Sequence, residues 1–351
     1  MSEQKARIGF IGTGYMGQLA HLANYASIPD CEVVAIAEAR PGLAAAVGQK
    51  YNIRNVYTDH HQLLADPAVQ AVVCIQPFHS NYHLGKDVLE SGRSLITEKP
   101  MVTRLDDGRE LVEIARRQGL TYAVGFMKRY DPGVQLARQK IAEALQSGEL
   151  GTLRMVDACC YMGDWLQNPG APVSVAEDAS PPEVVTRYPD HIPPPQYAAY
   201  DYLINVFAHN INLIRFLIPN EQLACVNGVL QYQSLSVNFK SGEVLVNLRG
   251  VPSASRNWNE ETRFVFDQGT IGLRTPPPMN RQAVSSVTVY KSDGSTAEET
   301  RLEAKVDWAF GRQARGFTAA LLGKGAPLAP ADDCLRDVEI MEDIFRKAVI
   351  A

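Results

Sequence analysis

A lysine follows a short apolar run and directly precedes a proline in the segment SLITEKPM, residues 94–101. The apolar run predicts a buried strand, which places Glu98 and Lys99 where that strand ends. In a site of low dielectric a lysine can donate a hydrogen bond to a hydroxyl, and its pKa can fall toward the range of acid–base catalysis. The alternative is a surface lysine paired with Glu98. Pro100 fixes its own φ and restricts the residue before it, so we expect Lys99 to be held in place.

A second segment, FIGTGYMGQ, contains the spacing G-x-G-x-x-G between an apolar strand and a helix. In that context the motif binds a dinucleotide, because free amides at the helix N-terminus face the pyrophosphate. The alternative is an ordinary glycine-rich turn. We expect the pyrophosphate to lie against Gly12, Thr13, Gly14, Tyr15, Met16 and Gly17.

An acidic residue also ends the second predicted strand, since Glu38 follows Gly17 by 21 residues. A carboxylate at this position can accept hydrogen bonds from both ribose hydroxyls, which favours NAD over NADP. Arg40 lies two residues further on and suits a 2′-phosphate, so NADP stays possible.

Alternating strand and helix signals between residues 7 and 127 predict a parallel, doubly wound sheet. One of its helices is expected to begin with Thr103 as N-cap and to end before Gly119. After about residue 130 strands with alternating patterns predominate, which predicts a mainly antiparallel sheet with helices on one face. The fold class is therefore α/β, with domains at 1–130 and 131–351.

A proline-rich stretch at about 163–200 is too long for a plain connection. It is either a surface excursion or a lid or subunit-contact arm. Its aromatic residues favour packing over disorder: Trp165, Tyr188, Tyr197 and Tyr200.

Composition narrows the possible partners and the compartment. The net charge of −5 favours neither nucleic acid nor an anionic membrane. The most apolar long stretch, 203–218, contains several polar side chains, so we expect no membrane span. The N-terminus shows no export signal and the six cysteines are scattered, which predicts reduced thiols in a cytoplasmic protein. No zinc-type spacing appears, and we expect no metal.

Several segments together resemble one family. FIGTGYMG, IQPFHSN, ITEKP, GFMKRYDP and SGELGTLRMV occur in the order and spacing of the Gfo/Idh/MocA family, which includes glucose–fructose oxidoreductase-like and inositol dehydrogenase-like enzymes. The resemblance covers nearly the whole chain apart from 163–200. It implies a Rossmann domain followed by an α/β domain with an open antiparallel sheet. It also implies that Lys99 contacts the reacting hydroxyl beside the nicotinamide.

The resemblance further points to the segment NVFAHNINLIRFL, residues 205–217. Family members usually carry D-x-x-x-H here, on one face of a helix, and the histidine accepts the proton of the alcohol. His209 matches the histidine, but Asn205 replaces the aspartate, and an amide cannot hold a negative charge. Asp201, one turn earlier, is a possible substitute. The alternative for His209 is a histidine of the core.

Two loops complete the expected site. The loop after the third long strand departs from the family pattern T-P-N-x-x-H, so its cofactor contacts should differ in detail. We expect cofactor contacts from Gln76, Pro77, Asn81, Glu98, Lys99 and Lys128, and substrate contacts from Lys99, Arg129, Asp201, Asn205 and His209. For Lys128 and Arg129 the alternative is a salt-bridged surface pair.

These observations predict reversible hydride transfer between NAD(H), with NADP(H) as the alternative cofactor, and a secondary alcohol of a sugar, sugar derivative or cyclitol. One alternative is an enzyme that cleaves a glycoside by transient oxidation and elimination; reduction of an aldehyde or imine is a lesser one. A non-catalytic NAD-binding sensor is also possible, because the aspartate is missing. By analogy with the family, a homodimer or homotetramer would cover the open sheet.

Overall fold

The structure is a computed structural model, which describes residues 5–167, 169–177, 184–218 and 222–351. Two compact units make up the chain. The first contains the residues up to Phe126 together with Gly170–Pro189 and Phe310–Val338. The second contains Met127–Pro169, Asp190–Ala309 and Glu339–Ala351. Each unit contains segments from different parts of the chain, so the units do not coincide with the predicted domains 1–130 and 131–351. That division of the chain into domains remains a prediction.

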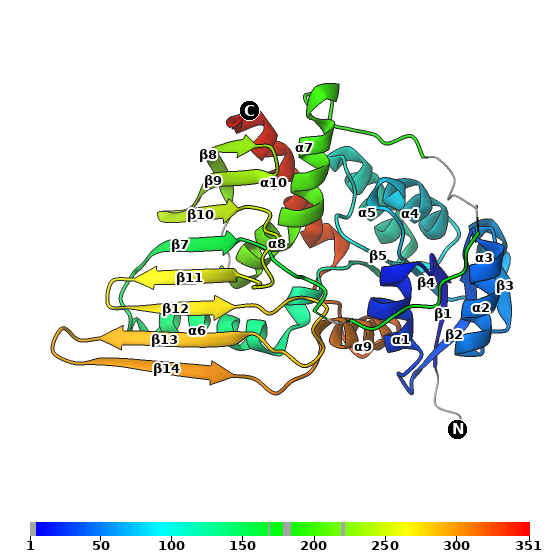
Figure 1. The fold of residues 1–351 in the computed structure, drawn as a ribbon, viewed down its shortest axis with the longest axis horizontal. Coiled ribbons are helices and arrows are strands. Elements are labelled where there is room, and N and C mark those ends of the chain that lie inside the picture. Colours follow the sequence, from blue (N-terminus) through cyan, green and yellow to red (C-terminus); the bar gives the residue numbers. More distant parts are fainter. Residues whose placement is uncertain (1–4, 168, 178–183, 219–221) are drawn as a thin grey trace. The chain divides into compact units, whose positions relative to one another are not determined.

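The first unit contains a six-stranded sheet in the order β3-β2-β1-β4-β5-β6, and every neighbouring pair is parallel (Figure 1). This order confirms the doubly wound fold, whose ligand site lies at the carboxyl ends of the strands. The strands are β1 (Ala6–Ile11), β2 (Cys31–Ala37), β3 (Asn55–Tyr57), β4 (Ala71–Cys74), β5 (Ser94–Thr97) and β6 (Tyr122–Val124).

Helices connect these strands and cover the sheet. Their apolar sides and the strands share one core, in which Phe10, Ile36 and Phe317 are fully buried. The helical elements are η1 (Gly17–Leu22, a π-helix), α1 (Ala23–Tyr25), α2 (Pro41–Tyr51), α3 (His60–Ala65), η2 (Phe78–Ser80), α4 (Asn81–Glu90), α5 (Leu105–Gln118) and most of α9 (Ala309–Leu321).

The start of α5 differs from the expectation. Arg104 is the N-cap residue and makes no side-chain capping bond. Thr103 lies one residue before this N-cap position, and its hydroxyl donates to the carbonyl oxygen of Arg187 at 2.6 Å. The predicted end is correct: Gly119 has the left-handed conformation that closes the helix.

The second unit contains a nine-stranded sheet in the order β14-β13-β12-β11-β7-β10-β9-β8-β15. It is mixed and mostly antiparallel, with parallel pairing between β10 and β7 and between β15 and β8. The strands are β7 (Leu153–Cys160), β8 (Ala224–Gln231), β9 (Ser234–Ser241), β10 (Val244–Gly250), β11 (Glu260–Phe266), β12 (Gly269–Arg274), β13 (Ser286–Ser292), β14 (Ala297–Glu303) and β15 (Ala348–Ile350).

Buried and exposed side chains alternate along β9, as expected for a sheet with one covered face. The unit's helical elements are η3 (Met127–Tyr130), α6 (Pro132–Ser147), η4 (Pro194–Gln196), α7 (Tyr197–Tyr202), η5 (Leu203–Phe207, a π-helix) and α8 (Ala208–Leu217). The long helix α10 (Ala331–Lys347) begins in the first unit and ends in the second.

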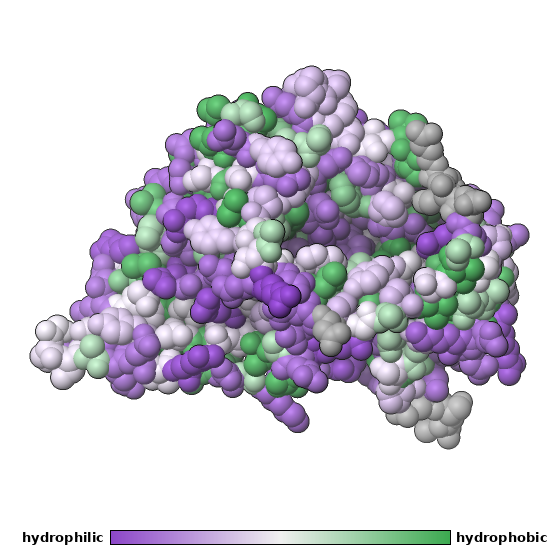
Figure 2. All heavy atoms as spheres, viewed as in Figure 1, coloured by the Kyte–Doolittle hydropathy of each residue, from purple (hydrophilic) through white to green (hydrophobic). Residues whose placement is uncertain are grey.

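Within the described ranges, no helix combines the length and apolar character that a membrane crossing needs. On the face drawn in Figure 2, hydrophilic and hydrophobic residues are interspersed over short distances.

Candidate active site

The three glycines of the loop after β1 have different surroundings. Gly12 has φ +90°, and a Cβ on it would lie 2.2 Å from the carbonyl oxygen of Ile75. A Cβ on Gly17 would lie 2.5 Å from the carbonyl oxygen of Gly12. Gly14 is open, and the nearest atom to its Cβ position would be Nη2 of Arg40 at 3.6 Å. The outer glycines are thus required by the fold, while the middle one leaves the backbone accessible, which fits a pyrophosphate.

Glu38 is buried just beyond β2 and accepts four hydrogen bonds. Its Oε2 accepts from the amide (2.9 Å) and the hydroxyl (3.2 Å) of Thr13. Its Oε1 accepts from the amide (3.3 Å) and Nε (2.7 Å) of Arg40. Burial raises the pKa of Glu38, but the bonds from Arg40 and Thr13 outweigh burial, so this pKa lies below its usual range. The carboxylate is therefore ionised and fixed beside the glycine loop, as a ribose acceptor requires.

The end of β5 is tied to the helix that follows the glycine loop. Glu98 Oε2 accepts from the amide of Lys99 at 3.0 Å, and Oε1 lies 2.7 Å from Nε2 of His21. His21 lies on η1 and is buried, with its ring edge-on to Phe310. No pattern in the sequence indicates a role for His21, because a single histidine in a helix has no characteristic spacing. The contact between Glu98 and His21 therefore connects the end of β5 with the helix that follows the glycine loop.

Asn81 holds the backbone on both sides of Lys99. Its side chain is fully buried, and Nδ2 donates to the carbonyl oxygens of Glu98 (2.9 Å) and Pro100 (2.8 Å). The Lys99–Pro100 peptide bond is cis. Lys99 itself is half-buried. Asn81 is therefore a positioning residue for Lys99, and its expected contact with a cofactor remains a prediction.

The other predicted loop residues border the glycine loop to different degrees. Gln76 lies against it, since a Cβ on Gly12 would be 2.5 Å from Nε2 of Gln76. Pro77 is exposed and precedes η2. Tyr15 is exposed and Met16 is half-buried.

The histidine predicted as proton acceptor lies in the second unit, near the start of α8. His209 is half-buried, Asn205 is exposed and Asp201 is half-buried on α7. Leu203–Phe207 form a π-helix, whose turn is wider than that of the regular α-helix expected here. That Asn205 and His209 share one face of the helix remains a prediction. Which of Asp201 and Asn205 assists His209 remains a prediction.

A buried ion pair lies beneath the helix of His209. Lys128 Nζ pairs with the carboxylate of Glu260, the first residue of β11. The same carboxylate accepts from Asn210 Nδ2 at 2.6 Å and from Thr275 Oγ1 at 2.5 Å. Because Asn210 follows His209 directly, this cluster fixes the start of α8.

A second contact fixes α8 two residues further along. Nε of the buried Arg129 donates to Oδ1 of Asn212 at 2.7 Å, and its guanidinium lies over the ring of Phe216. Lys128 and Arg129 are therefore not a surface pair: both are buried and bound within the second unit. Their contacts with cofactor or substrate remain predictions.

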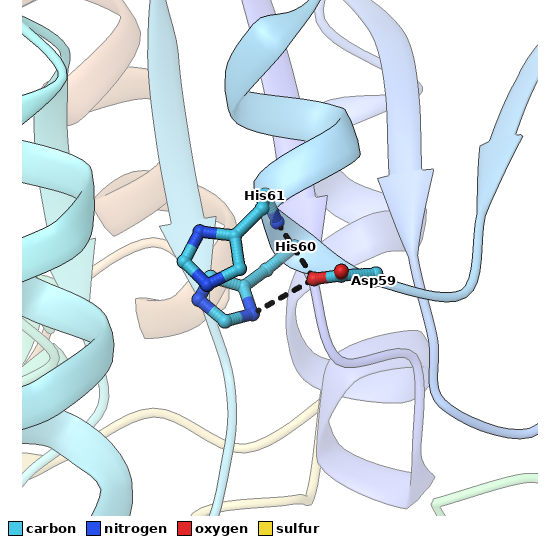
Figure 3. Close-up of side chains that lie close together, drawn as sticks. All are labelled: Asp59, His60 and His61. Atoms are coloured by element: carbon cyan, nitrogen blue, oxygen red, sulfur yellow. Dashed lines mark hydrogen bonds and ion pairs between the residues drawn. The ribbon is translucent and has the colours of Figure 1, made fainter.

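Figure 3 shows three potential metal ligands at the start of α3. Ligand atoms of Asp59, His60 and His61 lie within 4.8 Å of one another. Asp59 caps α3 by accepting from the amide of His61 at 2.9 Å, and His60 Nε2 lies 2.9 Å from Oδ2 of Asp87. Capping and this ion pair account for the arrangement, so we assign it no metal.

The first unit therefore has the sheet order, glycine loop and carboxylate of a dinucleotide-binding Rossmann domain. Residues 6–126 match the family model described as an oxidoreductase family with an NAD-binding Rossmann fold. This match confirms, over residues 6–126, the resemblance to the Gfo/Idh/MocA family that the sequence predicted.

Individual relatives extend the comparison. A levoglucosan dehydrogenase from Pseudarthrobacter phenanthrenivorans is 26% identical over 343 residues, which cover 92% of this chain and 82% of the relative. A scyllo-inositol 2-dehydrogenase (NAD(+)) from Bacillus subtilis is 26% identical over 149 residues, 42% of each chain. The chain thus matches less than half the length of the second relative.

Solved structures share the fold. The 3-ketoreductase KijD10 from Actinomadura kijaniata, crystallised with NADP, has a TM-score of 0.75 and 21% identity, with 99% of both chains covered. A putative myo-inositol dehydrogenase from Sinorhizobium meliloti has a TM-score of 0.69 and 18% identity, with 97% of both chains covered. At 21% and 18% sequence identity, these two comparisons show that the chain shares the fold of these proteins.

Proposed function

We propose that this protein transfers a hydride between NAD(H) and a secondary alcohol of a sugar, sugar derivative or cyclitol. The observation that carries the proposal is the fixation of Lys99. The amide of Asn81 and the carboxylate of Glu98 hold its backbone at the carboxyl end of β5, in the unit that bears the glycine loop. The names of the relatives support the substrate class.

Each residue has one role in this mechanism. The segment 12–17 binds the pyrophosphate, and Glu38 accepts from the adenosine ribose. When bound, the nicotinamide supplies the hydride acceptor. Lys99 donates to the substrate oxygen and holds it, while an imidazole nitrogen of His209 takes the hydroxyl proton. The carbonyl product then forms without a metal ion.

Two alternatives remain, and the second of them is favoured by the exposed Asn205, which stands where a negatively charged neighbour of His209 was expected. A glycoside-cleaving enzyme would oxidise the sugar transiently and return the hydride, with no net NADH. A sensor would bind NAD and turn nothing over.

We also propose a homodimer or homotetramer. The uncovered face of the nine-stranded sheet carries the exposed apolar side chains Val229 and Leu245 beside the ion pair of Arg249 and Asp157. Such a mixed surface suits association with a second copy.

The test is a panel of sugars and cyclitols incubated with enzyme and NAD, with reduced cofactor followed by absorbance and products by chromatography. Lys99→Met should lower kcat by about 10²-fold or more while the Kd for NAD stays unchanged. Lys140→Met, which removes a half-buried lysine that pairs with Glu143 on α6, is the matched control and should leave both values unchanged. NAD binding without turnover of any polyol would refute the proposal in favour of a sensor, whereas glycoside cleavage without NADH would favour elimination.

A further inference from the structure

Residues 170–177, part of the proline-rich stretch, are attached to the first unit at two places. Near one end, Gln18 on η1 donates to the carbonyl oxygen of Val173 at 3.0 Å and accepts from its amide at 2.8 Å. At the other end, the carboxylate of Glu177 accepts from the amides of Gly42 (2.9 Å) and Leu43 (2.7 Å). Figure 1 shows this segment in green, passing from the helix of the glycine loop to α2.

Glu177 therefore occupies the N-terminus of α2. The free amides and the dipole of a helix N-terminus favour an anion, and here a side chain of the same chain supplies it. The helix begins at Pro41, directly after Arg40 and close to Glu38. The two carboxylates also act on one guanidinium: the bond from Glu38 and the charges of Glu38 and Glu177 raise the pKa of Arg40.

This position matters for the choice between two cofactors. NADP differs from NAD by a phosphate on the 2′-oxygen of the adenosine ribose. In a Rossmann domain that oxygen meets the residue at the end of the second strand, and a nearby arginine accommodates the phosphate. In this chain the groups suited to that phosphate already have acidic partners. Nε of Arg40 donates to Glu38, and the first amides of α2 donate to Glu177.

The charges also oppose a phosphate. Glu38, Glu177 and Arg40 together carry a net charge of −1, since two carboxylates face one guanidinium. A phosphate monoester brings about −1.5 to −2 more at pH 7. Resting on the function proposed above, we propose that Glu177 is a specificity-determining residue that occupies the 2′-phosphate position and excludes NADP.

The alternative is a purely structural role, in which Glu177 only attaches residues 170–177 to α2. The two roles predict different results. A specificity residue changes the affinity for NADP and leaves that for NAD nearly constant, because NAD brings no second anion to α2. A mere attachment point changes both affinities in the same direction, or changes only the stability of the fold.

The experiment measures the Kd of each cofactor by calorimetry without substrate, so it does not depend on turnover. Glu177→Gln keeps the size and one acceptor oxygen but removes the charge, and Glu177→Ala removes the carboxylate. Each should lower the Kd for NADP by about tenfold or more and change that for NAD by less than about threefold. Asp59→Asn is the matched control, because it removes a carboxylate from the N-terminus of α3, and the ratio of the two Kd values should stay constant.

Three results would overturn the inference: tight binding of NADP by the wild type, an unchanged Kd ratio in both variants, or an equal change for both cofactors. Thermal melts show whether each variant folds. If Glu177→Ala does not fold, the Kd values of the isosteric variant Glu177→Gln decide between the two roles. If the wild type binds neither cofactor, the proposed function fails as well. If NAD binds and polyols are oxidised, but the ratio of the Kd values for NADP and NAD is the same in the variants as in the wild type, only the proposed role of Glu177 fails.

Discussion

Replacing Asn81 by alanine removes both donors that hold the backbone around Lys99. In the wild type, Nδ2 donates to the carbonyl oxygens of Glu98 at 2.9 Å and Pro100 at 2.8 Å. Alanine leaves both oxygens without this partner. Because Asn81 is fully buried, water has no ready access to replace it.

The structure allows an estimate of the cost. Two hydrogen bonds contribute about 1 kcal/mol each, and a buried carbonyl without a partner adds about 1–3 kcal/mol. We therefore expect Asn81→Ala to lower the free energy of unfolding by about 3–5 kcal/mol. Since Lys99 is then less well placed, kcat should fall on the order of 10²-fold, as for other misplacements of catalytic groups. The Kd for NAD should stay within about twofold, because the glycine loop and Glu38 are untouched.

Urea unfolding and NAD titration provide the measurements. Asn238→Ala is the control, since Nδ2 of Asn238 donates to Oδ1 of Asn227 at 2.8 Å and both side chains are exposed. Its free energy of unfolding should change by less than about 0.5 kcal/mol. If Asn81→Ala costs less than about 1 kcal/mol and leaves kcat unchanged, the two bonds do not hold Lys99 and the reasoning is refuted.

Further predictions concern buried charges and thiols. Glu260→Ala should lower the free energy of unfolding by about 3–5 kcal/mol, because it leaves the charge of Lys128 buried without its partner; a loss below about 1 kcal/mol in urea unfolding would contradict this. The lowered pKa of Glu38 means that its contribution to stability is present above the usual value of 4.5 and is lost as pH falls through the lower folded value. The unfolding free energy of the wild type should therefore decline more steeply with acidification below pH 4.5 than that of Glu38→Gln. Burial raises the pKa of Cys74 to about 12, so a disulfide reagent at about pH 8 should modify the half-buried Cys159 first and Cys74 only after unfolding.

Much of the first unit could be predicted because its signals are local. Glycine at fixed spacing after an apolar strand indicates a phosphate loop, and an acid at the end of the next strand indicates a ribose contact. Glu38 and Thr13 lie where these patterns place them, with the carboxylate 2.9 Å from the amide of Thr13. The alternating strands of the second unit were visible for the same reason.

The contacts that fix the site were not predictable, because they join polar residues far apart in the chain. Glu98 and His21 are separated by 77 positions, and Glu177 and Leu43 by 134. Such pairs leave no periodic pattern. Thr103 satisfied a local capping rule, yet its hydroxyl found a partner 84 residues away.

Two elements were missed for local reasons. The strand β14, with sequence AEETRLE, is largely exposed at the edge of its sheet and lacks the apolar alternation that marks a strand. The short strand β15 follows α10 directly, and its three residues carry too little pattern to distinguish it from a continuation of that helix.

The π-helix at Leu203–Phe207 makes the residue count of this segment as important as its residue types. Each residue of an α-helix advances the chain by about 100° around the axis, and a wide turn accommodates one additional residue without breaking the helix. Deleting one residue here would restore a regular helix while rotating Asp201 by about that angle relative to His209. A single-codon insertion or deletion can therefore change which side chain stands beside the histidine. Among related chains, length differences at this point should accompany the loss or gain of the acid.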